Sequence, residues 1–163
     1  MKKSLLSTLI LFFTLLLLCG CSNFGKSVKV TAAMNRAVSS SILVHNKGLY
    51  SKADKSFEAH KIYGATEKNG ETDVFTYTLF ETFNRSTKTT VQAGGAGPVL
   101  IKLKKQRRSY KAVNYKEAKD GSMYADSIKK MFPRRYANEA ISDSENTTDL
   151  ETKIQKKVSS WLK

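Results

Sequence analysis

The pattern of hydrophobic and polar positions predicts a helix over residues 27–46. Apolar side chains recur there at steps of three and four residues, which places them on one face of an α-helix. The sequence Asn46-Lys47-Gly48 ends the pattern, because glycine readily takes the left-handed conformation found after helices. The stripe consists of Val30, Ala33, Met34, Ala37, Val38, Ser41 and Ile42. We expect it to pack against a core.

The period changes to two at Phe57, where apolar and polar residues begin to alternate as in a half-buried strand. Asn69-Gly70 follows, and this dipeptide is a strong signal for a two-residue hairpin turn. The return strand covers residues 71–84. Its apolar face consists of Phe75, Tyr77, Leu79 and Phe83. An aromatic face of this kind predicts a sheet buried on one side by a helix.

Residues 85–97 break the strand pattern, with several threonines followed by Gly94-Gly95-Ala96-Gly97. We predict an irregular connection here, either a flexible anion-binding loop or a solvated hairpin loop. Alternation returns over residues 98–104 and again over residues 109–117. These two runs predict a third and a fourth strand, joined by a short turn.

Two or three shorter helices are predicted in the C-terminal part of the chain. Ser122 is a candidate N-cap for a helix that ends at Pro133, and residues 134–141 have a second helical pattern. Thr148 and Glu151 have the spacing of a capping box at the start of a last helix, which ends near residue 162. The apolar stripe of this last helix either packs on the domain or lies on a membrane surface.

Together these elements predict an α+β fold. A long N-terminal helix lies on a four-stranded antiparallel meander sheet, and two or three helices follow at the C-terminus. This order is similar to that of the cystatin-like and NTF2-like folds. The similarity concerns architecture and says nothing direct about function.

The first residues of the chain have the pattern of a secretory signal. Lys2 and Lys3 precede an uncharged apolar run over residues 5–18, which is shorter than the roughly 17–25 residues of a membrane-spanning helix. The sequence Leu18-Cys19-Gly20-Cys21 resembles the lipobox of bacterial lipoproteins. This resemblance implies that Cys21 carries lipid on its sulfur and becomes the first residue after cleavage. An uncleaved anchor helix is the alternative.

This reading divides the chain into a lipoprotein signal peptide (1–20), a lipidated tether (21–26) and a single α+β domain (27–163). It places the domain at the cell membrane, lipid-anchored on the outer, extracytoplasmic face. No cysteine follows Cys21, so disulfide frameworks and cysteine metal sites are excluded from the domain.

The chain is strongly basic, with a formal net charge of +14. For an extracytoplasmic domain, we expect anionic lipid head groups or a teichoic-acid-like polymer as partners rather than nucleic acid. The alternative is that the charge only maintains solubility. The densest basic cluster falls at the predicted hairpin tip and consists of Lys102, Lys104, Lys105, Arg107, Arg108 and Lys111. It is a candidate contact with an anionic surface, or a set of charges that protects the sheet edge.

Candidate catalytic groups are scattered. His45 and His60 fall in different predicted elements, and no Gly-x-Ser-x-Gly sequence is present. Glu58, Asp73 and Glu81 could supply acid pairs for glycoside cleavage, but nothing in the sequence sets two of them at the required separation. We therefore predict no catalytic residues, no metal and no cofactor. The predicted function is a non-enzymatic binding or sensing module, with an envelope hydrolase or an electrostatic binder of wall polymer as alternatives.

Several short motifs carry a resemblance to a known domain. They include His45-Asn46-Lys47-Gly48, Glu58-Ala59-His60-Lys61-Ile62 and Asp120-Gly121-Ser122-Met123-Tyr124. The stretch from about Val38 to Pro133 resembles an uncharacterised extracytoplasmic domain of low-GC Gram-positive bacteria. That domain occurs as a free lipoprotein and also fused to antirepressor-type membrane metallopeptidases of the beta-lactam-sensing class. The chain lacks the His-Glu-x-x-His sequence of such peptidases, so the resemblance implies at most ligand sensing or partner contact.

Overall fold

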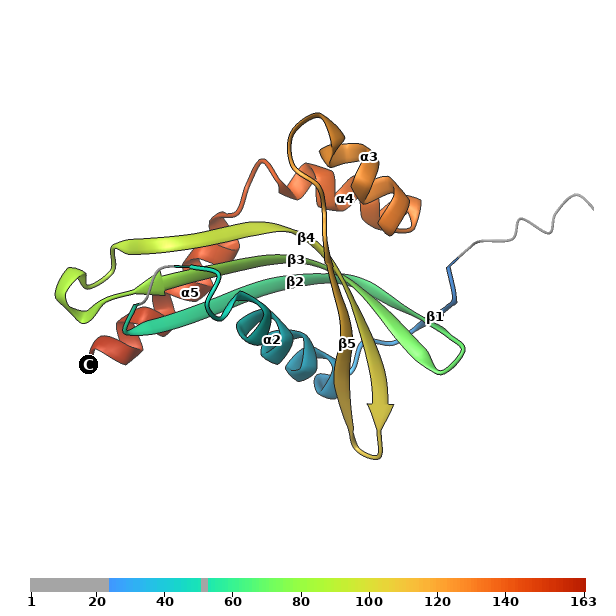
Figure 1. Cartoon of the computed structure of the whole chain (residues 1–163), viewed down its shortest axis with the longest axis horizontal. Coiled ribbons are helices and arrows are strands. Elements are labelled where there is room, and N and C mark those ends of the chain that lie inside the picture. The colour runs from blue at the N-terminus through green and yellow to red at the C-terminus, as the bar shows by residue number, and fades with distance from the viewer. Residues whose placement is uncertain (1–23, 51–52) are drawn as a thin grey trace, which may run out of the picture.

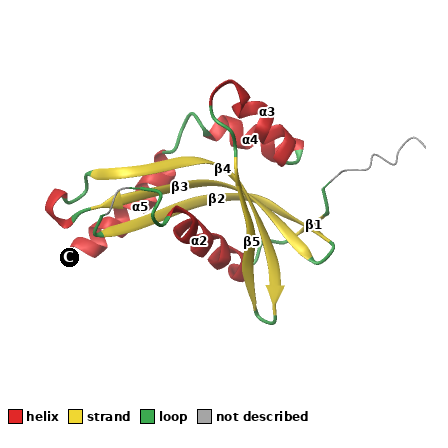
Figure 2. Ribbon diagram, in the orientation of Figure 1, coloured by secondary structure: helices red, strands yellow, loops and turns green. Residues whose placement is uncertain are grey.

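The computed structural model describes residues 24–50 and 53–163, and Cys21 lies outside these ranges. Its centre is a five-stranded antiparallel sheet with the strands in sequence order (Figure 1). The strands are β1 (Lys26–Val28), β2 (Lys55–Lys68), β3 (Glu71–Phe83), β4 (Val91–Gln106) and β5 (Ser109–Glu117). The helices are α2 (Ala32–Asn46), α3 (Tyr124–Met131), α4 (Arg134–Asp143) and α5 (Thr148–Leu162), as Figure 2 shows. The α+β class and the three C-terminal helices are thus confirmed.

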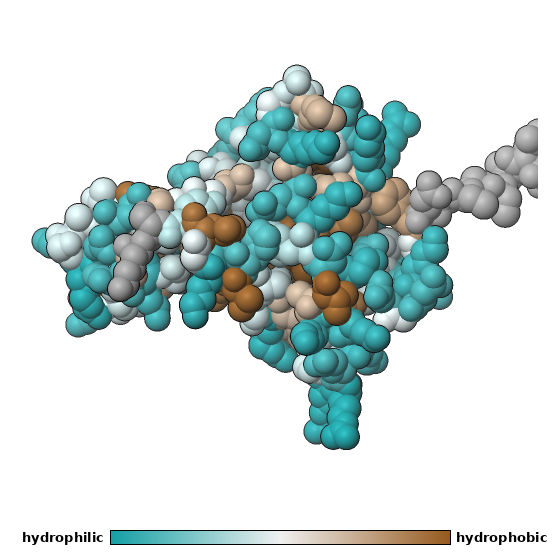
Figure 3. Space-filling model, in the orientation of Figure 1, coloured by the Kyte–Doolittle hydropathy of each residue, from teal (hydrophilic) through white to brown (hydrophobic). Residues whose placement is uncertain are grey.

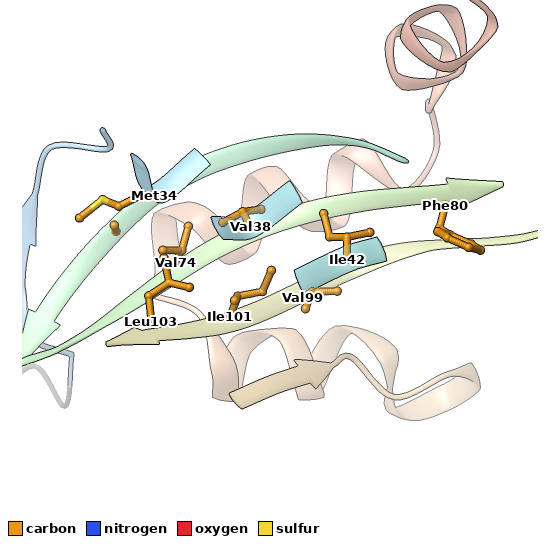
Figure 4. Close-up of a cluster of buried hydrophobic side chains, with 9 residues drawn as sticks. Met34, Val38, Ile42, Val74, Phe80, Val99, Ile101 and Leu103 are labelled. Atoms are coloured by element: carbon orange, nitrogen blue, oxygen red, sulfur yellow. The ribbon is translucent and has the colours of Figure 1, made fainter. Parts of the chain in front are cut away.

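Helix α2 covers one face of the sheet. Val38 and Ile42 are fully buried and face Val74 of β3 and Ile101 of β4, as the close-up in Figure 4 shows. The helix begins at Ala32, where the hydroxyl of Thr31 accepts a hydrogen bond from the backbone N–H of Met34 at 3.2 Å. The predicted start at residue 27 was therefore wrong.

The residues just before α2 form β1 instead, which pairs with β2 through Lys26 and Glu67. The sheet therefore has five strands rather than the predicted four. A three-residue edge strand has no periodicity of its own, because it is held by backbone hydrogen bonds to a partner distant in sequence.

Strand β3 is buried on both faces, which corrects the prediction of a sheet covered on one side. Val74 and Phe80 point toward α2, whereas Phe75 and Leu79 point toward the C-terminal helices. Helices α3 and α4 pack on Phe75, and α5 packs its buried Leu150, Ile154 and Val158 on the Leu79 region. The apolar stripe of α5 is therefore part of the core.

The glycine-rich stretch is a strand rather than the predicted irregular loop, because β4 begins at Val91. Only residues 84–90 connect it to β3, with a 3-10 turn at Arg85–Thr87. Gly94 lies so close to β3 that an added Cβ would collide with the carbonyl oxygen of Phe80. Glycine is needed here for a close backbone approach, a role that composition alone does not distinguish from a flexible loop.

The C-terminal helix starts also differ from the prediction. Ser122 lies in the 3-10 turn Gly121–Met123 and caps nothing, since α3 begins at Tyr124. The N-cap of α5 is Thr147 rather than Thr148, and its hydroxyl lies 2.5 Å from a carboxylate oxygen of Glu151. In the described part of the chain, no helix is both long and apolar enough to cross a membrane.

Candidate functional site

The first residue of β1 and the turns of the β2–β3 and β4–β5 hairpins lie at the same end of the sheet. One cross-strand row links Lys26 of β1 to Glu67, Thr72, Leu103 and Ala112 of the next four strands. The β4–β5 hairpin extends beyond this row and projects from the body of the domain (Figure 1). The chain therefore enters β1 at the end of the sheet that carries the basic tip, and Phe24, two residues before β1, packs on Phe75 of β3 with ring centroids 6.0 Å apart.

The predicted basic cluster divides into one paired lysine and five exposed residues. Lys102 contacts Asp73 at 2.8 Å and Glu71 at 3.3 Å, and its hydrogen bond to Asp73 raises the lysine pKa despite partial burial. Figure 3 shows the projecting tip covered by hydrophilic residues. The exposed members are Lys104, Lys105, Arg107, Arg108 and Lys111. Lys102 therefore ties β4 to β3, and the other five form what we call the basic tip.

Two charges of the basic tip oppose each other directly. Lys104 and Lys111 are cross-strand partners in the β4–β5 ladder. Like charges at such positions destabilise a hairpin, whereas an unlike pair contributes roughly 0.2–1 kcal/mol. The arrangement concentrates positive charge at the tip at some cost in stability.

His60 belongs to a buried polar cluster between α2, β2 and α5. Its Nδ1 lies 2.7 Å from one carboxylate oxygen of Glu58, and the hydroxyl of Ser39 donates to the other at 2.7 Å. The ammonium of Lys157 lies 3.6 Å from the same carboxylate and donates to the Glu58 carbonyl oxygen. Burial acts to raise the pKa of Glu58, but the hydrogen bonds from His60 and Ser39 and the nearby positive charges lower it overall.

This cluster connects α2, β2 and α5, because each supplies a side chain that contacts the buried Glu58 carboxylate. Ser39 hydrogen-bonds the carboxylate and not the imidazole, so the Ser–His–acid order of a nucleophilic triad is absent from it. Among the described residues, no group of three or more His, Cys, Asp or Glu side chains could hold a metal ion.

The three carboxylates considered for glycoside cleavage do not lie close to one another. Glu58 faces α2, whereas Glu81 lies opposite Phe57 on the other face of the sheet. Asp73 pairs with Lys102 eight residues along β3 from Glu81, roughly 27 Å away in an extended strand. No two of these three groups can therefore flank one glycosidic bond.

Two Ser-x-x-Lys sequences, the spacing of beta-lactam-acylating serines, occur at Ser127–Lys130 and Ser160–Lys163. The hydroxyl of Ser127 donates to the Tyr124 carbonyl at 2.8 Å and accepts from the Lys119 N–H at 2.9 Å. It thereby fixes the start of α3. The Ser-Asp-Asn and Lys-Thr-Gly sequences that accompany such a serine are absent from the chain.

A polar notch lies where β5 ends beside β4, with a cavity of about 230 Å³. It is lined by Tyr50, Tyr115, Tyr124, Glu117 and Asp120, and by residues 95–99 of β4. Burial, with a contribution from the Glu117 charge, raises the pKa of Tyr115 to about 12, so its hydroxyl stays protonated. We call this site the acidic notch.

His45 contacts two of the residues that line the acidic notch. Its ring stacks on Tyr115 with centroids 3.9 Å apart, and its Nε2 lies 3.5 Å from a carboxylate oxygen of Glu117. His45 also lies in the last turn of α2, where a positive charge is favourable. Sequence reasoning missed this site because its walls come from segments that are far apart in the chain.

No protein-family model, no curated protein and no solved structure matches this chain.

Proposed function

We propose that the chain is a non-enzymatic binding or sensing module of the cell envelope, held by a lipid on Cys21 at the outer face of the membrane. Its basic tip faces anionic lipid head groups. The supporting observation is the sheet end that combines the first strand, Lys26–Val28, with the projecting tip. The lipobox-like sequence supplies the anchor, and the tip supplies a second contact.

The distances along the chain fit this orientation. Phe24 already packs on Phe75, so three residue steps separate Cys21 from the first residue held by the fold, a reach of about 10 Å when fully extended. A lipid on Cys21 therefore keeps this end of the sheet close to the head groups. Each Lys or Arg near an anionic surface contributes about 1 kcal/mol, and the effect decays within a Debye length of ~10 Å at 0.1 M salt.

The non-enzymatic role is supported by what the candidate catalytic groups contact. Glu58 and His60 satisfy each other inside the fold, and Asp73 pairs with Lys102. Phe75 and Leu79 belong to the core, and Tyr77 lies in the same core and lines a small cavity of about 100 Å³ beside Lys61 and Asp143. Helix α2 across the sheet supports the finer proposal of a cystatin-like or NTF2-like fold, and the resemblance to an extracytoplasmic sensor domain supports partner contact.

The anchor is tested with the full-length chain in a Gram-positive host fed radiolabelled palmitate. We expect label and membrane attachment in the wild type and the loss of both in Cys21→Ala. Retention of label in Cys21→Ala would refute the lipid anchor.

The orientation is tested with the purified lipoprotein in phosphatidylglycerol vesicles that contain a quencher lipid. A fluorophore is attached to Ser109→Cys at the tip or, as a matched control, to Ser159→Cys on the exposed side of α5. We expect quenching of the tip label only, and its loss in high salt. Equal quenching of both labels would contradict the orientation, and salt-sensitive binding to teichoic acid without tip quenching would assign the tip to wall polymer.

The role of charge is tested by reversing all five residues of the basic tip to Glu. We expect the tip label to lose its quenching while the lipoprotein stays in the membrane. The matched control reverses five exposed basic residues on the C-terminal helices: Lys129, Lys130, Arg134, Lys153 and Lys156. This control has the same change in net charge and leaves the quenching intact.

A further inference from the structure

The sheet has two long outer edges that no other described strand covers. β1 pairs with β2 only over residues 65–67, so residues 55–64 of β2 have no strand on their outer side in the described structure. β5 pairs with β4 only over residues 99–106, which leaves residues 91–97 of β4 equally uncovered among described residues. An uncovered edge offers backbone donors and acceptors to another strand.

The β2 edge is protected against such pairing. It carries the charged side chains of Lys55 and Lys61, and Lys157 of α5 crosses it to donate to the carbonyl oxygen of Glu58 at 2.5 Å. Charges and covering groups of this kind are the usual means by which edge strands avoid unwanted partners.

The β4 edge lacks these protections. Residues 91–97 contain no charged side chain and no proline, in a chain with 42 charged residues counted as 28 basic plus 14 acidic. Gly94 and Ala96 add almost no bulk to this edge. A partner strand can therefore approach it closely.

The outward direction of the free peptide groups follows from one hydrogen bond. The carbonyl of Pro98 accepts from the N–H of Ala118 at 3.0 Å, on the side away from β3. Since the direction alternates along a strand, the N–H and C=O groups of Ala96 and Gly94 also point away from β3. They form a ladder ready for a further antiparallel strand.

The acidic notch marks where such a strand would begin. β5 runs antiparallel to β4 and ends beside Val99, after which the chain turns away. A strand that continued the line of β5 would start in the notch and run toward Val91. The first group of that strand would meet the carboxylates of Glu117 and Asp120 and the hydroxyls of the three tyrosines.

We propose that the outer edge of β4 binds the amino-terminal segment of a peptide by strand addition, with the peptide α-ammonium group between Glu117 and Asp120. Charge complementarity selects this occupant, because a positive terminus meets two carboxylates. A second copy of the chain fits less well, since it would bring together two strongly basic molecules. The uncovered stretch accommodates about six residues at ~3.4 Å each.

The backbone and the side chains of the peptide have different roles in this proposal. Backbone hydrogen bonds supply affinity, and side chains on alternate positions of the peptide lie over the two faces of the sheet. Next to the first peptide residues, Tyr50 lies on the α2 face, where it stacks on Phe80 with centroids 5.3 Å apart. The proposal rests on the binding role proposed above, but not on membrane contact of the basic tip.

The test uses the purified lipoprotein in detergent micelles and the probe Val-Thr-Val-Thr-Val-Thr with a free amino terminus. We expect saturable binding and slowed hydrogen exchange at the amides of Gly94 and Ala96. N-acetylation of the probe, or Glu117→Gln with Asp120→Asn, weakens binding about tenfold or more. The matched charge control is Asp126→Asn with Glu145→Gln, which removes two exposed carboxylates elsewhere and leaves binding unchanged.

Ala96→Pro tests the backbone ladder, because it removes an N–H that points outward and makes no bond within the sheet. We expect a folded protein by circular dichroism that no longer binds the probe. Equal binding of free and acetylated probe, or full binding by folded Ala96→Pro, overturns the proposal. Concentration-dependent dimers without probe binding also overturn it and assign the edge to a second copy. None of these readouts depends on tip–membrane contact, so failure here is distinct from failure of the orientation proposed above.

Discussion

The Nδ1 of His60 lies 2.7 Å from a carboxylate oxygen of Glu58, two residues earlier on the same strand. An ionised carboxylate only accepts hydrogen bonds, so the imidazole is the donor in this pair. Both side chains are almost fully buried, with relative exposures of 9% for His60 and 5% for Glu58. The pair locks β2 to α2 through Ser39 and to α5 through Lys157.

Removal of the Glu58 carboxylate should strongly destabilise the fold. Glu58→Ala leaves the buried groups of His60 and Ser39 without their acceptor, and we expect a loss of about 3–5 kcal/mol in the free energy of unfolding. Urea denaturation measures this loss. The matched control is Glu117→Ala, which breaks the more exposed pair with His45 and should cost less than about 1 kcal/mol. Equal losses in the two variants would contradict the structural role of the cluster.

The same pair predicts a loss of stability in acid. The pKa of Glu58 is lowered in the folded state from its ordinary value of 4.5. The stabilisation is therefore fully present above that value and disappears as the pH falls through the lower folded pKa. Urea denaturation over a pH series should show this fall in the wild type. A Glu58→Gln protein should show a flatter acid limb, and an unchanged slope would argue against the assignment to Glu58.

Ionisation of Glu81 should have the opposite effect on stability to ionisation of Glu58. Its pKa is raised by burial and by the charge of Glu151, and its Oε2 has no hydrogen-bond partner in the described structure. The ionised form is thus disfavoured in the fold, and stability increases as the pH falls through the raised pKa. Glu81→Gln removes the buried charge and should stabilise the protein at neutral pH by about 0.5–2 kcal/mol. Thermal denaturation at pH 7 and pH 4 checks this, with a smaller gain expected at pH 4.

Two glycines of β4 should differ in their tolerance of a methyl group. Gly94→Ala places a Cβ against the carbonyl oxygen of Phe80, so β3 and β4 must separate and the protein should lose roughly 1–3 kcal/mol. Gly97→Ala meets no atom within 4 Å and should be close to neutral. A comparison of their denaturation midpoints distinguishes close strand packing from a flexible loop, in which both substitutions would be tolerated.

The basic tip should show a conflict between stability and membrane contact. Lys104→Glu places an acidic residue opposite Lys111 and should raise the free energy of unfolding by about 0.2–1 kcal/mol in low salt. The same change should reduce quenching of the tip label in phosphatidylglycerol vesicles. Lys104→Gln is the control that removes the repulsion without adding attraction, and its stability should lie between the two.

Local signals in the sequence predicted whether most segments form a helix or a strand. The alternation over residues 109–117 predicted the bounds of β5, and Asn69-Gly70 predicted the turn between β2 and β3. Both turn residues have positive φ, 54° and 75°, as expected for an Asn-Gly hairpin turn. The stripe of α2 likewise identified Val38 and Ile42 as core residues. These features are encoded locally, because side-chain spacing and turn conformation depend on neighbouring residues.

Tertiary structure alone decided which residues meet. It made residues 26–28 a strand, because only pairing with β2 satisfies their backbone. It paired Lys102 with Asp73, so this lysine is not one of the exposed charges of the basic tip. It also placed the glycine-rich stretch in a strand with one uncovered edge. The acidic notch also exists only in the fold, because its walls come from the segment after α2, the end of β5 and the start of α3. Such contacts depend on register between strands distant in sequence, which periodicity does not encode.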